Sequence, residues 1–578
     1  MSLNERNKKT VVMTHTSLFW FLSSKFPLIV EDVLVLVSVL LYFVVGRKIE
    51  KSLFKQASIL ALALGSFYLR PVLETVISFS FDSSRRNTVC KDSLKGRGHK
   101  APFRPCADSG LTVGICLFPL LFVSVNMNDS FIFSMLFAVS VSSGVLVLMS
   151  IAAGNYDGLD KTRQVLVLRE LFLSYLLSLV SCSIFVSSID LSILFLCATT
   201  NCLFPVFMRI CIYCLSGSFS LAEAIIISES GVSLLVYCIL ISLLPPIDDI
   251  SMNEGVYSLH KMSCAIGMAI VIFFFGYSFL FTFSGYRVRG NHSGRSDEKN
   301  SPYSIQNSCY FIGYILIDLV FCYLWLNWFV LHPEKVLFNY IIHSWSAMWL
   351  IIYWVVLLCL VLFLIPPYRL NVVPIVARKY YHLVLFFILL PSLFVEAAFI
   401  SLCSIVALFL LIIVELGRAS HVYGIRWWVN DYMSALVDYR DNGTIYMTHL
   451  YLLLGSCFTL WQHPPCSLLG MSGMVTLGIV DTTTACFGTF SGKTKWPGTY
   501  KTMEGTFSGM LLGVVSCYLL HILCVECSLQ RMDWHIVFIL SSSYLLSTML
   551  EAFTTQIDNL VVPLYHYVVL RQLIIITL

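Results

Sequence analysis

Residues 131–152 read FIFSMLFAVSVSSGVLVLMSIA and contain no charged side chain. An α-helix needs about 20 predominantly apolar residues to cross the hydrocarbon core of a bilayer, and this run is long enough. Comparable runs recur along the chain, near 28–46, 57–80, 110–126, 131–152, 164–188, 191–214, 220–245, 262–285, 308–331, 340–366, 380–397, 398–416, 447–461, 467–490, 505–527, 534–556 and 558–576. The sequence therefore predicts an all-α polytopic integral membrane protein with about 15–17 transmembrane helices.

The composition of the 578 residues supports the same class. Hydrophobic residues make up 58% of the chain and charged residues 12%, about half the roughly 25% that soluble domains carry. The mean hydropathy is +0.82. These values exclude a soluble globular domain, a disordered chain and a collagen. Lys and Arg number 37 and Asp and Glu 33, so the formal charge of +4 is too small to indicate a nucleic-acid partner.

Basic residues gather on alternate loops. These loops are 81–109, 153–163, 286–307, 367–379, 417–446 and 491–504, and the short loop 47–56 breaks the pattern. Because cytoplasmic loops carry an excess of Lys and Arg, the basic face is expected to be cytoplasmic. Asn128-Asp129-Ser130 is expected on the opposite, lumenal face.

Two regions differ in where their polar residues lie. Residues 1–365 form an N-terminal multi-span region with few ionisable residues inside the spans. Arg70 and Glu74 stand at i, i+4 and are expected to pair across one helical turn, whereas Glu223 and Glu229 receive no role. Residues 366–578 form a C-terminal membrane domain whose polar residues cluster at span ends, and no internal repeat is visible in the chain.

The C-terminal clusters are separated from one another by two spans each, so all of them are expected at one membrane face. They contain Arg378, Lys379 and His382; Arg440, Asp441 and His449; Asp481; the segment 488–506; and Glu551, Gln556, Asp558 and Asn559. This convergence predicts a functional site built from loops and helix ends of the C-terminal domain.

The segment 488–506 is rich in Gly, Thr and Lys. Glycine backbone N–H groups can close on an anion, lysines add charge, and the span that begins near Gly505 points its N-terminal dipole at the loop. The candidate nucleotide-binding residues are Gly488, Lys493, Lys495, Gly498, Thr499, Lys501, Thr502, Gly505 and Thr506. An ordinary basic cytoplasmic loop explains the lysines equally well. A P-loop is rejected because only three residues separate Gly488 from Gly492, where that motif has four.

Carboxylates close to this loop are candidate ligands of Mg²⁺, which proteins usually hold through one or two carboxylates and substrate phosphates. The candidates are Asp481, Asp441, Glu504 and Asp558. Asp481 is preferred because an acid within an apolar span is expected to be functional, although a hydrogen bond to a neighbouring helix is the alternative. His382 and His449 could move a proton. The predicted catalytic set is therefore Asp481, Lys501, Asp441, His449 and Asp558, with Asp481 and Asp558 as metal ligands.

Over about residues 370–565 the chain resembles the polyprenol kinase family and, within it, most closely the dolichol kinases. The matching stretches are Arg378-Lys379-Tyr380-Tyr381-His382, Arg440-Asp441, Thr448 to Gly455, Gly478 to Asp481, Trp496-Pro497-Gly498-Thr499 with Lys501-Thr502 and Glu504-Gly505-Thr506, and Glu551 to Asn559. The ordered set is specific, whereas each piece alone is weak. Through this resemblance, the candidate nucleotide-binding residues also include Trp496, Pro497 and Glu504. The wider site includes, by the same resemblance, Arg378, Lys379, His382, Arg440 and Asn559.

The resemblance implies a reaction in which CTP and dolichol give dolichyl phosphate and CDP with a divalent cation such as Mg²⁺. It also implies that the Trp496–Thr499 loop binds CTP on the cytoplasmic face of the endoplasmic reticulum membrane, and that the product carries sugars for protein glycosylation. The sequence carries no signal for an oligomeric state.

Three other functions remain open at this point. A CTP-dependent cytidylyltransferase acting on phosphatidate has the same requirements for CTP, a metal and a membrane-bound substrate. A kinase of a shorter isoprenoid alcohol such as phytol is a close variant. A transporter fits less well, because transporters place polar groups near the membrane midplane on interrupted helices.

Overall fold

The structure is a computed structural model that describes residues 26–44, 53–79, 103–104, 107–125, 131–153, 164–186, 190–243, 254–283, 302–330, 332–361, 374–391, 397–422, 441, 443–463, 467–523 and 534–577. Arg440, Asn442 and the expected domain boundary at 365/366 lie outside them. The helices are Phe26–Val44, α2 (Leu53–Phe79), α3 (Leu111–Val125), α4 (Phe131–Ala152), α5 (Gln164–Phe185), α6 (Leu191–Asn201), α7 (Leu203–Arg209), η4 (Ile210–Cys214), α8 (Leu221–Leu243), α9 (Glu254–Phe283), α10 (Pro302–Phe329), α11 (Pro333–His343), α12 (Trp345–Cys359), α13 (Pro374–Leu389), α14 (Ala397–Ala419), α16 (Thr448–Gln462), α17 (Leu468–Val475), η9 (Thr476–Val480), α18 (Asp481–Phe490), α19 (Met503–Leu523), α20 (Trp534–Phe553) and α21 (Asp558–Thr577).

The all-α polytopic architecture is confirmed. Within the described residues, 12 helices are long and apolar enough to cross a membrane, or 13 if α11 and α12, which meet at 92°, form one span. Three of the predicted ranges hold short helices that are not among these 12. α3, α13 and α16 have 15, 16 and 15 residues, fewer than the roughly 20 that a straight span needs.

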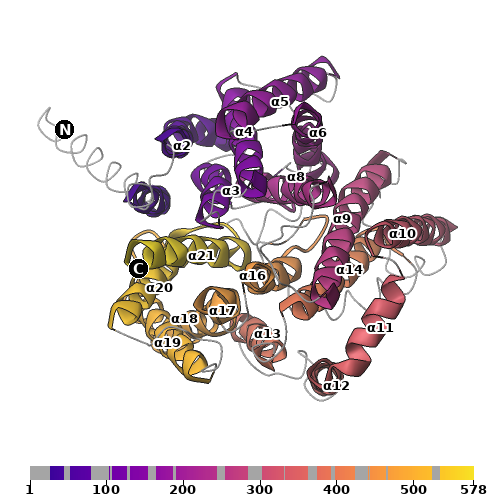
Figure 1. Cartoon of the computed structure of the whole chain (residues 1–578). Helices are drawn as coiled ribbons and strands as arrows, with labels where there is room; N and C mark the ends of the chain where they lie inside the picture. The colour runs from indigo at the N-terminus through magenta and orange to yellow at the C-terminus, as the bar shows by residue number, and fades with distance from the viewer. Residues whose placement is uncertain are drawn as a thin grey trace, which may run out of the picture.

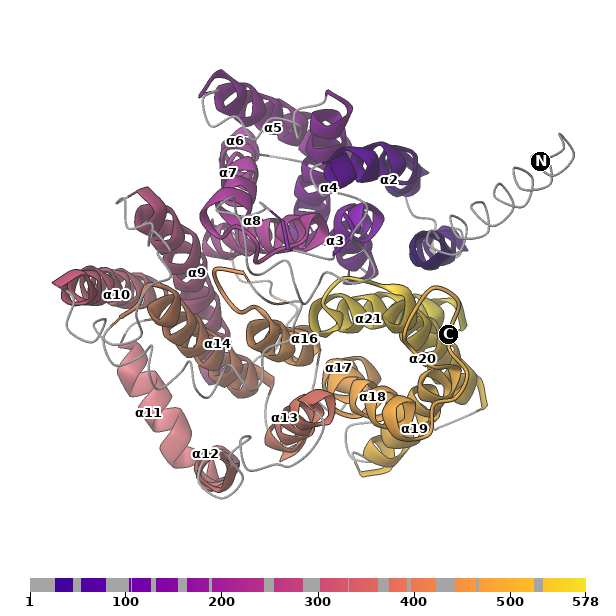
Figure 2. The same cartoon turned by 180° about the vertical axis from the view of Figure 1, so that it is seen from behind.

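The helices form groups that meet near α16 and α21 (Figures 1 and 2). Helices α2 to α6 gather at one end of the molecule, and α17 to α20 lie on the far side of α21 from them. α21 contacts α3 from the N-terminal region as well as α16, α17 and α20. It thereby joins the two regions that the sequence distinguishes.

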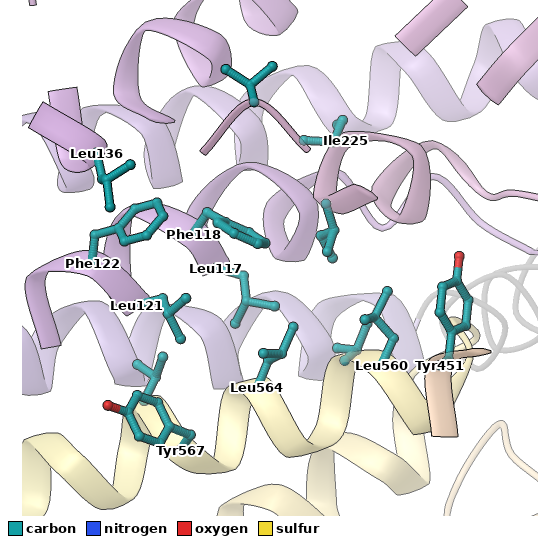
Figure 3. Close-up of a cluster of buried hydrophobic side chains, with 14 of the residues drawn as sticks. Leu117, Phe118, Leu121, Phe122, Leu136, Ile225, Tyr451, Leu560, Leu564 and Tyr567 are labelled. Atoms are coloured by element: carbon teal, nitrogen blue, oxygen red, sulfur yellow. The ribbon is translucent and has the colours of Figure 1, made fainter. Parts of the chain in front are cut away.

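The contact between α3 and α21 is a close apolar interface (Figure 3). Leu117 and Leu121 of α3 face Leu560 and Leu564 of α21, and all four are at most 3% exposed. In a membrane the lipid tails are as apolar as leucine, so such an interface is stabilised by van der Waals packing and not by transfer from water. The shape complementarity of α3 and α21 therefore contributes to the stability of the contact between the two regions.

Arg70 of α2 pairs with acids from other parts of the chain. It contacts Glu31 at 2.8 Å and Asp32, both on the helix Phe26–Val44, whereas the side chain of Glu74 lies outside the described residues. Partners in a neighbouring helix cannot be recognised from i, i+4 spacing. Here they compensate the charge of a guanidinium that is buried among apolar helices.

Glycine allows α16 to approach α21 closely. A Cβ atom at Gly455 would lie 2.2 Å from the backbone oxygen of Asn559 and 2.7 Å from Cγ of Pro563. Small residues of this kind let the backbones of membrane helices come together. The result is that Asn559, at the start of α21, lies against the first turns of α16.

We therefore expect Gly455→Ala to lower the free energy of unfolding by about 1–3 kcal/mol, as overpacking of a close interface does. The measurement is thermal unfolding of the purified protein in detergent. Gly313→Ala in α10 is the matched control, because nothing lies within 4 Å of its added Cβ. Equal unfolding temperatures for the two variants would contradict the importance of this approach.

Candidate functional site

Asp481 lies at a break in a membrane helix. The range Leu468–Phe490 begins as α17, continues through the π-helical turn η9 and ends as α18, of which Asp481 is the first residue. Such π-turns occur frequently at functional sites. Within η9, a Cβ atom at Gly478 would lie 2.5 Å from Cβ of Phe386. Glycine at this position thus lets α13 pack directly on the turn.

Because α13 is so close, two of its side chains reach Asp481. Lys379 Nζ donates to both carboxylate oxygens, at 2.6 Å to Oδ1 and 2.5 Å to Oδ2. His382 Nε2 lies 3.2 Å from Oδ2 and 3.0 Å from Oδ1 of Asn559. All four side chains are buried. Asp481 is therefore a carboxylate held between a lysine and a histidine inside the helix bundle.

A second buried carboxylate, Glu551, lies beside the first. It belongs to the last turn of α20 and accepts hydrogen bonds from Lys501 Nζ at 2.7 Å and from Thr484 Oγ1 at 3.0 Å. Thr484 lies on α18, one turn after Asp481. Desolvation alone would lower the pKa of the Lys501 ammonium, but the carboxylates of Glu551, Asp558 and Asp481 outweigh it and raise that pKa.

Asp558 completes a group of three carboxylates. It begins α21, and one oxygen each from Asp481, Glu551 and Asp558 lies within 4.8 Å of the other two. Lys379 contacts Asp481 and Lys501 contacts Glu551, so two of the three carboxylates are paired with a lysine. Oxygen ligands from carboxylates are those that Mg²⁺ and other hard divalent cations prefer, so the donor set fits such an ion.

The segment between α18 and α19 forms a compact hairpin over this group. Lys495 and Thr502 form an isolated β-bridge, and the N–H of Trp496 donates to the carbonyl oxygen of Lys501 at 3.0 Å. Gly498 has a φ of 75°, a conformation that glycine adopts without strain. The hairpin is therefore formed by residues of the segment that the sequence predicts to bind a nucleotide.

Several of the predicted nucleotide-binding residues hold the hairpin together. Glu504 accepts a hydrogen bond from the N–H of Thr494 at 2.9 Å, and Trp496 Nε1 donates to Thr506 Oγ1 at 2.9 Å. Lys493, Lys495, Pro497 and Gly498 are exposed, and the side chain of Lys501 is 44% exposed. Gly505 lies close to α18, since a Cβ there would be 2.7 Å from the backbone oxygen of Thr484. Among the predicted nucleotide-binding residues, the three lysines are therefore exposed, whereas Thr502 and Thr506 are buried.

Asp441 and His449 lie at the beginning of α16. Asp441 Oδ2 accepts hydrogen bonds from the N–H of Thr448 at 2.8 Å and from its hydroxyl at 2.7 Å. Burial raises the pKa of Asp441 to about 6 despite these bonds. Asp441 is not a member of the three-carboxylate group, and its contacts are those of a residue that fixes a helix end. Asn559 Nδ2 donates to the carbonyl oxygen of Thr448 at 3.2 Å. His449 is the next residue after Thr448 on α16.

The structure thus brings together Lys379, His382, Asp481, Lys501, Asp558 and Asn559 from the predicted set. It adds Glu551, to which the sequence assigns no role. The signal for Glu551 is the one that points to Asp481, namely an acid at the end of an otherwise apolar run. Arg378, whose carbonyl oxygen contacts His382 Nδ1 at 3.0 Å, lies at the edge of the group.

Comparisons with known proteins point in one direction. The chain is 33% identical over 208 residues to a dolichol kinase of Homo sapiens, covering 34% of this chain and 38% of that protein. It is 30% identical over 267 residues to the enzyme of that name from Mus musculus, covering 43% and 49%. A dolichol kinase of Arabidopsis thaliana is 25% identical over 335 residues, covering 56% and 58%.

The matched part spans about half the length of these relatives. No family model matches the chain, and no solved structure does. The comparisons nevertheless confirm the resemblance that the motifs between Arg378 and Asn559 predict: the chain is similar to the dolichol kinases of animals and plants.

Proposed function

We propose that this protein is a CTP-dependent dolichol kinase of the endoplasmic reticulum membrane. The observation that carries the proposal is the group formed by Asp481, Glu551 and Asp558, flanked by Lys379 and Lys501 and covered by the 491–502 hairpin. Such a group suits the triphosphate of a nucleotide together with a divalent cation. The similarity to dolichol kinases supports the alcohol as the acceptor.

The three carboxylates would hold the cation, which when bound neutralises charge on the β- and γ-phosphates. Lys501 and the exposed Lys493 and Lys495 attract the triphosphate from the water side. Lys379 and His382 fix the orientation of the Asp481 carboxylate through their contacts at 2.6 and 3.2 Å. Catalysis of phosphoryl transfer then consists of positioning and charge stabilisation.

The position of the group suits the two substrates. Dolichol is dissolved in lipid and CTP in water, so the reaction requires a site where the two phases meet. Glu551 and Asp558 come from the adjoining ends of α20 and α21, and Asp481 lies inside the range Leu468–Phe490, which leads into a hairpin with exposed lysines. The alcohol hydroxyl can approach from the bilayer side and the nucleotide from the hairpin side.

The test uses membranes containing the protein, incubated with CTP labelled either at the γ- or at the α-phosphorus and with dolichol, phytol or phosphatidate. We expect label in dolichyl phosphate from γ-labelled CTP only. Label from α-labelled CTP in a product of phosphatidate would indicate a cytidylyltransferase, and labelled phytyl phosphate a kinase of shorter alcohols. No labelled lipid with any substrate would defeat the proposal.

Orientation is tested separately. If the hairpin is cytoplasmic, Ser491→Cys should react with an impermeant thiol reagent in sealed microsomes, since Ser491 is exposed. Ser130→Cys, in the loop expected on the lumenal face, is the matched control and should react only after detergent is added. The reverse pattern would invert the orientation. The Asn442-Gly443-Thr444 sequon should likewise remain unglycosylated.

A further inference from the structure

A turn of four residues, Thr554 to Ile557, separates two of the three carboxylates. Glu551 lies in the last turn of α20 and Asp558 is the first residue of α21. The conformation of this turn therefore sets the distance between two proposed metal ligands. The turn itself contains no charged side chain.

The N-terminal region holds this turn at several points. Thr554 Oγ1 donates to Glu31 Oε1 at 3.1 Å. Gln556 Nε2 donates to Asp108 Oδ1 at 2.7 Å, and the Gln556 amide oxygen accepts a hydrogen bond from Ser220 Oγ. The N–H of Ile557 donates to Glu223 Oε1 at 2.9 Å.

The three acids among these partners belong to two buried groups of charged side chains, one around Arg70 and one around Arg104. Glu31 and Asp108 both contact Arg70, at 2.8 and 3.4 Å. Glu223 contacts Arg104 at 2.6 Å, and both side chains are fully buried. The acceptors of the turn are thus fixed by cations that lie outside the C-terminal domain. An acceptor held in this way cannot rotate away from its donor without leaving a buried charge unpaired.

The fit around Gln556 is close. A Cβ atom at Gly110 would lie 2.5 Å from Gln556 Nε2 and 2.8 Å from Cβ of Ala222. Gly110 has a φ of 54°, which glycine tolerates. Gln556 is fully buried, so its amide is enclosed by the start of α3, the start of α8 and the turn.

We propose that Gln556 and Thr554 are positioning residues, through which the N-terminal region fixes the separation of Glu551 and Asp558 and thereby the affinity of the site for a divalent cation. This inference rests on the proposed function of the three carboxylates. It assigns to the N-terminal region a part in the site that its sequence does not reveal. Partners beyond the direct ligands commonly contribute 10–100-fold to metal affinity or activity.

The test measures metal binding directly, by Mn²⁺ electron paramagnetic resonance on the full-length protein purified in detergent, alongside turnover as a function of Mg²⁺. We expect Gln556→Ala to raise the dissociation constant for Mn²⁺ about 10-fold. At saturating Mg²⁺ most of the turnover should return, because no direct ligand has been removed. Gln572→Ala is the matched control, a buried glutamine farther along α21.

Thr554→Val provides a second variant that keeps side-chain volume and removes only the hydroxyl. We expect about a 3-fold rise in the same dissociation constant, smaller than the roughly 10–100-fold effects of partners that contact the ligands themselves, because Thr554 makes one hydrogen bond to the N-terminal region. Its control is Thr548→Val in α20, whose hydroxyl donates within its own helix at 2.9 Å. Both variants can be compared at equal folded concentration, so loss of abundance does not enter the result.

Two outcomes would overturn the inference and differ in what they say about the site. Wild-type protein that binds no Mn²⁺ would remove the proposed metal site and the inference with it. If wild type, Gln556→Ala and Thr554→Val all bind Mn²⁺ with the same affinity, the metal site stands. Only the positioning role of Gln556 and Thr554 is then excluded.

Discussion

Asp481→Asn is expected to lower turnover about 10²–10³-fold, equivalent to roughly 3–4 kcal/mol of transition-state stabilisation. Asparagine keeps the shape of the side chain and removes the charge that a cation requires. The measurement is transfer of label from γ-labelled CTP to dolichol at equal protein concentration. Wild-type turnover would exclude Asp481 as a metal ligand and direct attention to Glu551 and Asp558.

The abundance of this variant needs its own control, because Lys379 donates to both oxygens of Asp481. Breaking a buried ion pair on one side leaves the other charge unpaired, which is strongly destabilising. We therefore expect Asp481→Asn to accumulate less than wild type. The double variant Lys379→Met with Asp481→Asn should recover abundance without recovering turnover. Recovery of both would assign Asp481 to helix packing alone.

Lys501→Ala is expected to reduce turnover by a similar factor of about 10²–10³, since in the proposed site it removes a preorganised charge that stabilises the transferring phosphoryl group. The Lys501 side chain is 44% exposed, so little packing is lost, but the buried carboxylate of Glu551 loses the ammonium 2.7 Å away. Turnover is therefore compared at equal folded concentration. A lysine ammonium, whose ordinary pKa is about 10.4, is protonated at neutral pH. The effect should therefore persist unchanged across neutral and mildly alkaline pH.

The control for Lys501 is Lys335→Ala, an exposed lysine on α11. It removes the same charge at a position outside the carboxylate group and should be near neutral. If Lys335→Ala and Lys501→Ala lowered turnover equally, the effect would come from net charge and not from the site.

The helices and part of the site are predictable from local features of the sequence. Apolar runs such as 131–152 are long enough to identify spans, and a described helix lies in every predicted range. Asp481 is recognisable because an acid in an apolar run is costly unless it has partners. Lys379 and His382 are recognisable as part of an ordered set of motifs.

Contacts between distant parts of the chain are not predictable in this way. Ile557 donates to Glu223, 334 positions earlier, and no motif includes Glu223 or indicates this contact. Arg70 stands four residues before Glu74, and this spacing gives no sign of its contacts with Glu31 and Asp32 on another helix. Which of several compatible partners a buried charge adopts depends on how the helices pack, and packing is not encoded in spacing.

The central position of α21 bears on how the protein is assembled during translation. Every described helix that α21 contacts precedes it in the chain, so each has left the ribosome before α21 does. Glu223 and Asp108 are therefore synthesised before the N–H of Ile557 and the side-chain amide of Gln556, from which they accept hydrogen bonds. α21 has to pack against helices that are already synthesised. The three carboxylates of the site come together only when α21, which carries Asp558, has joined the other helices.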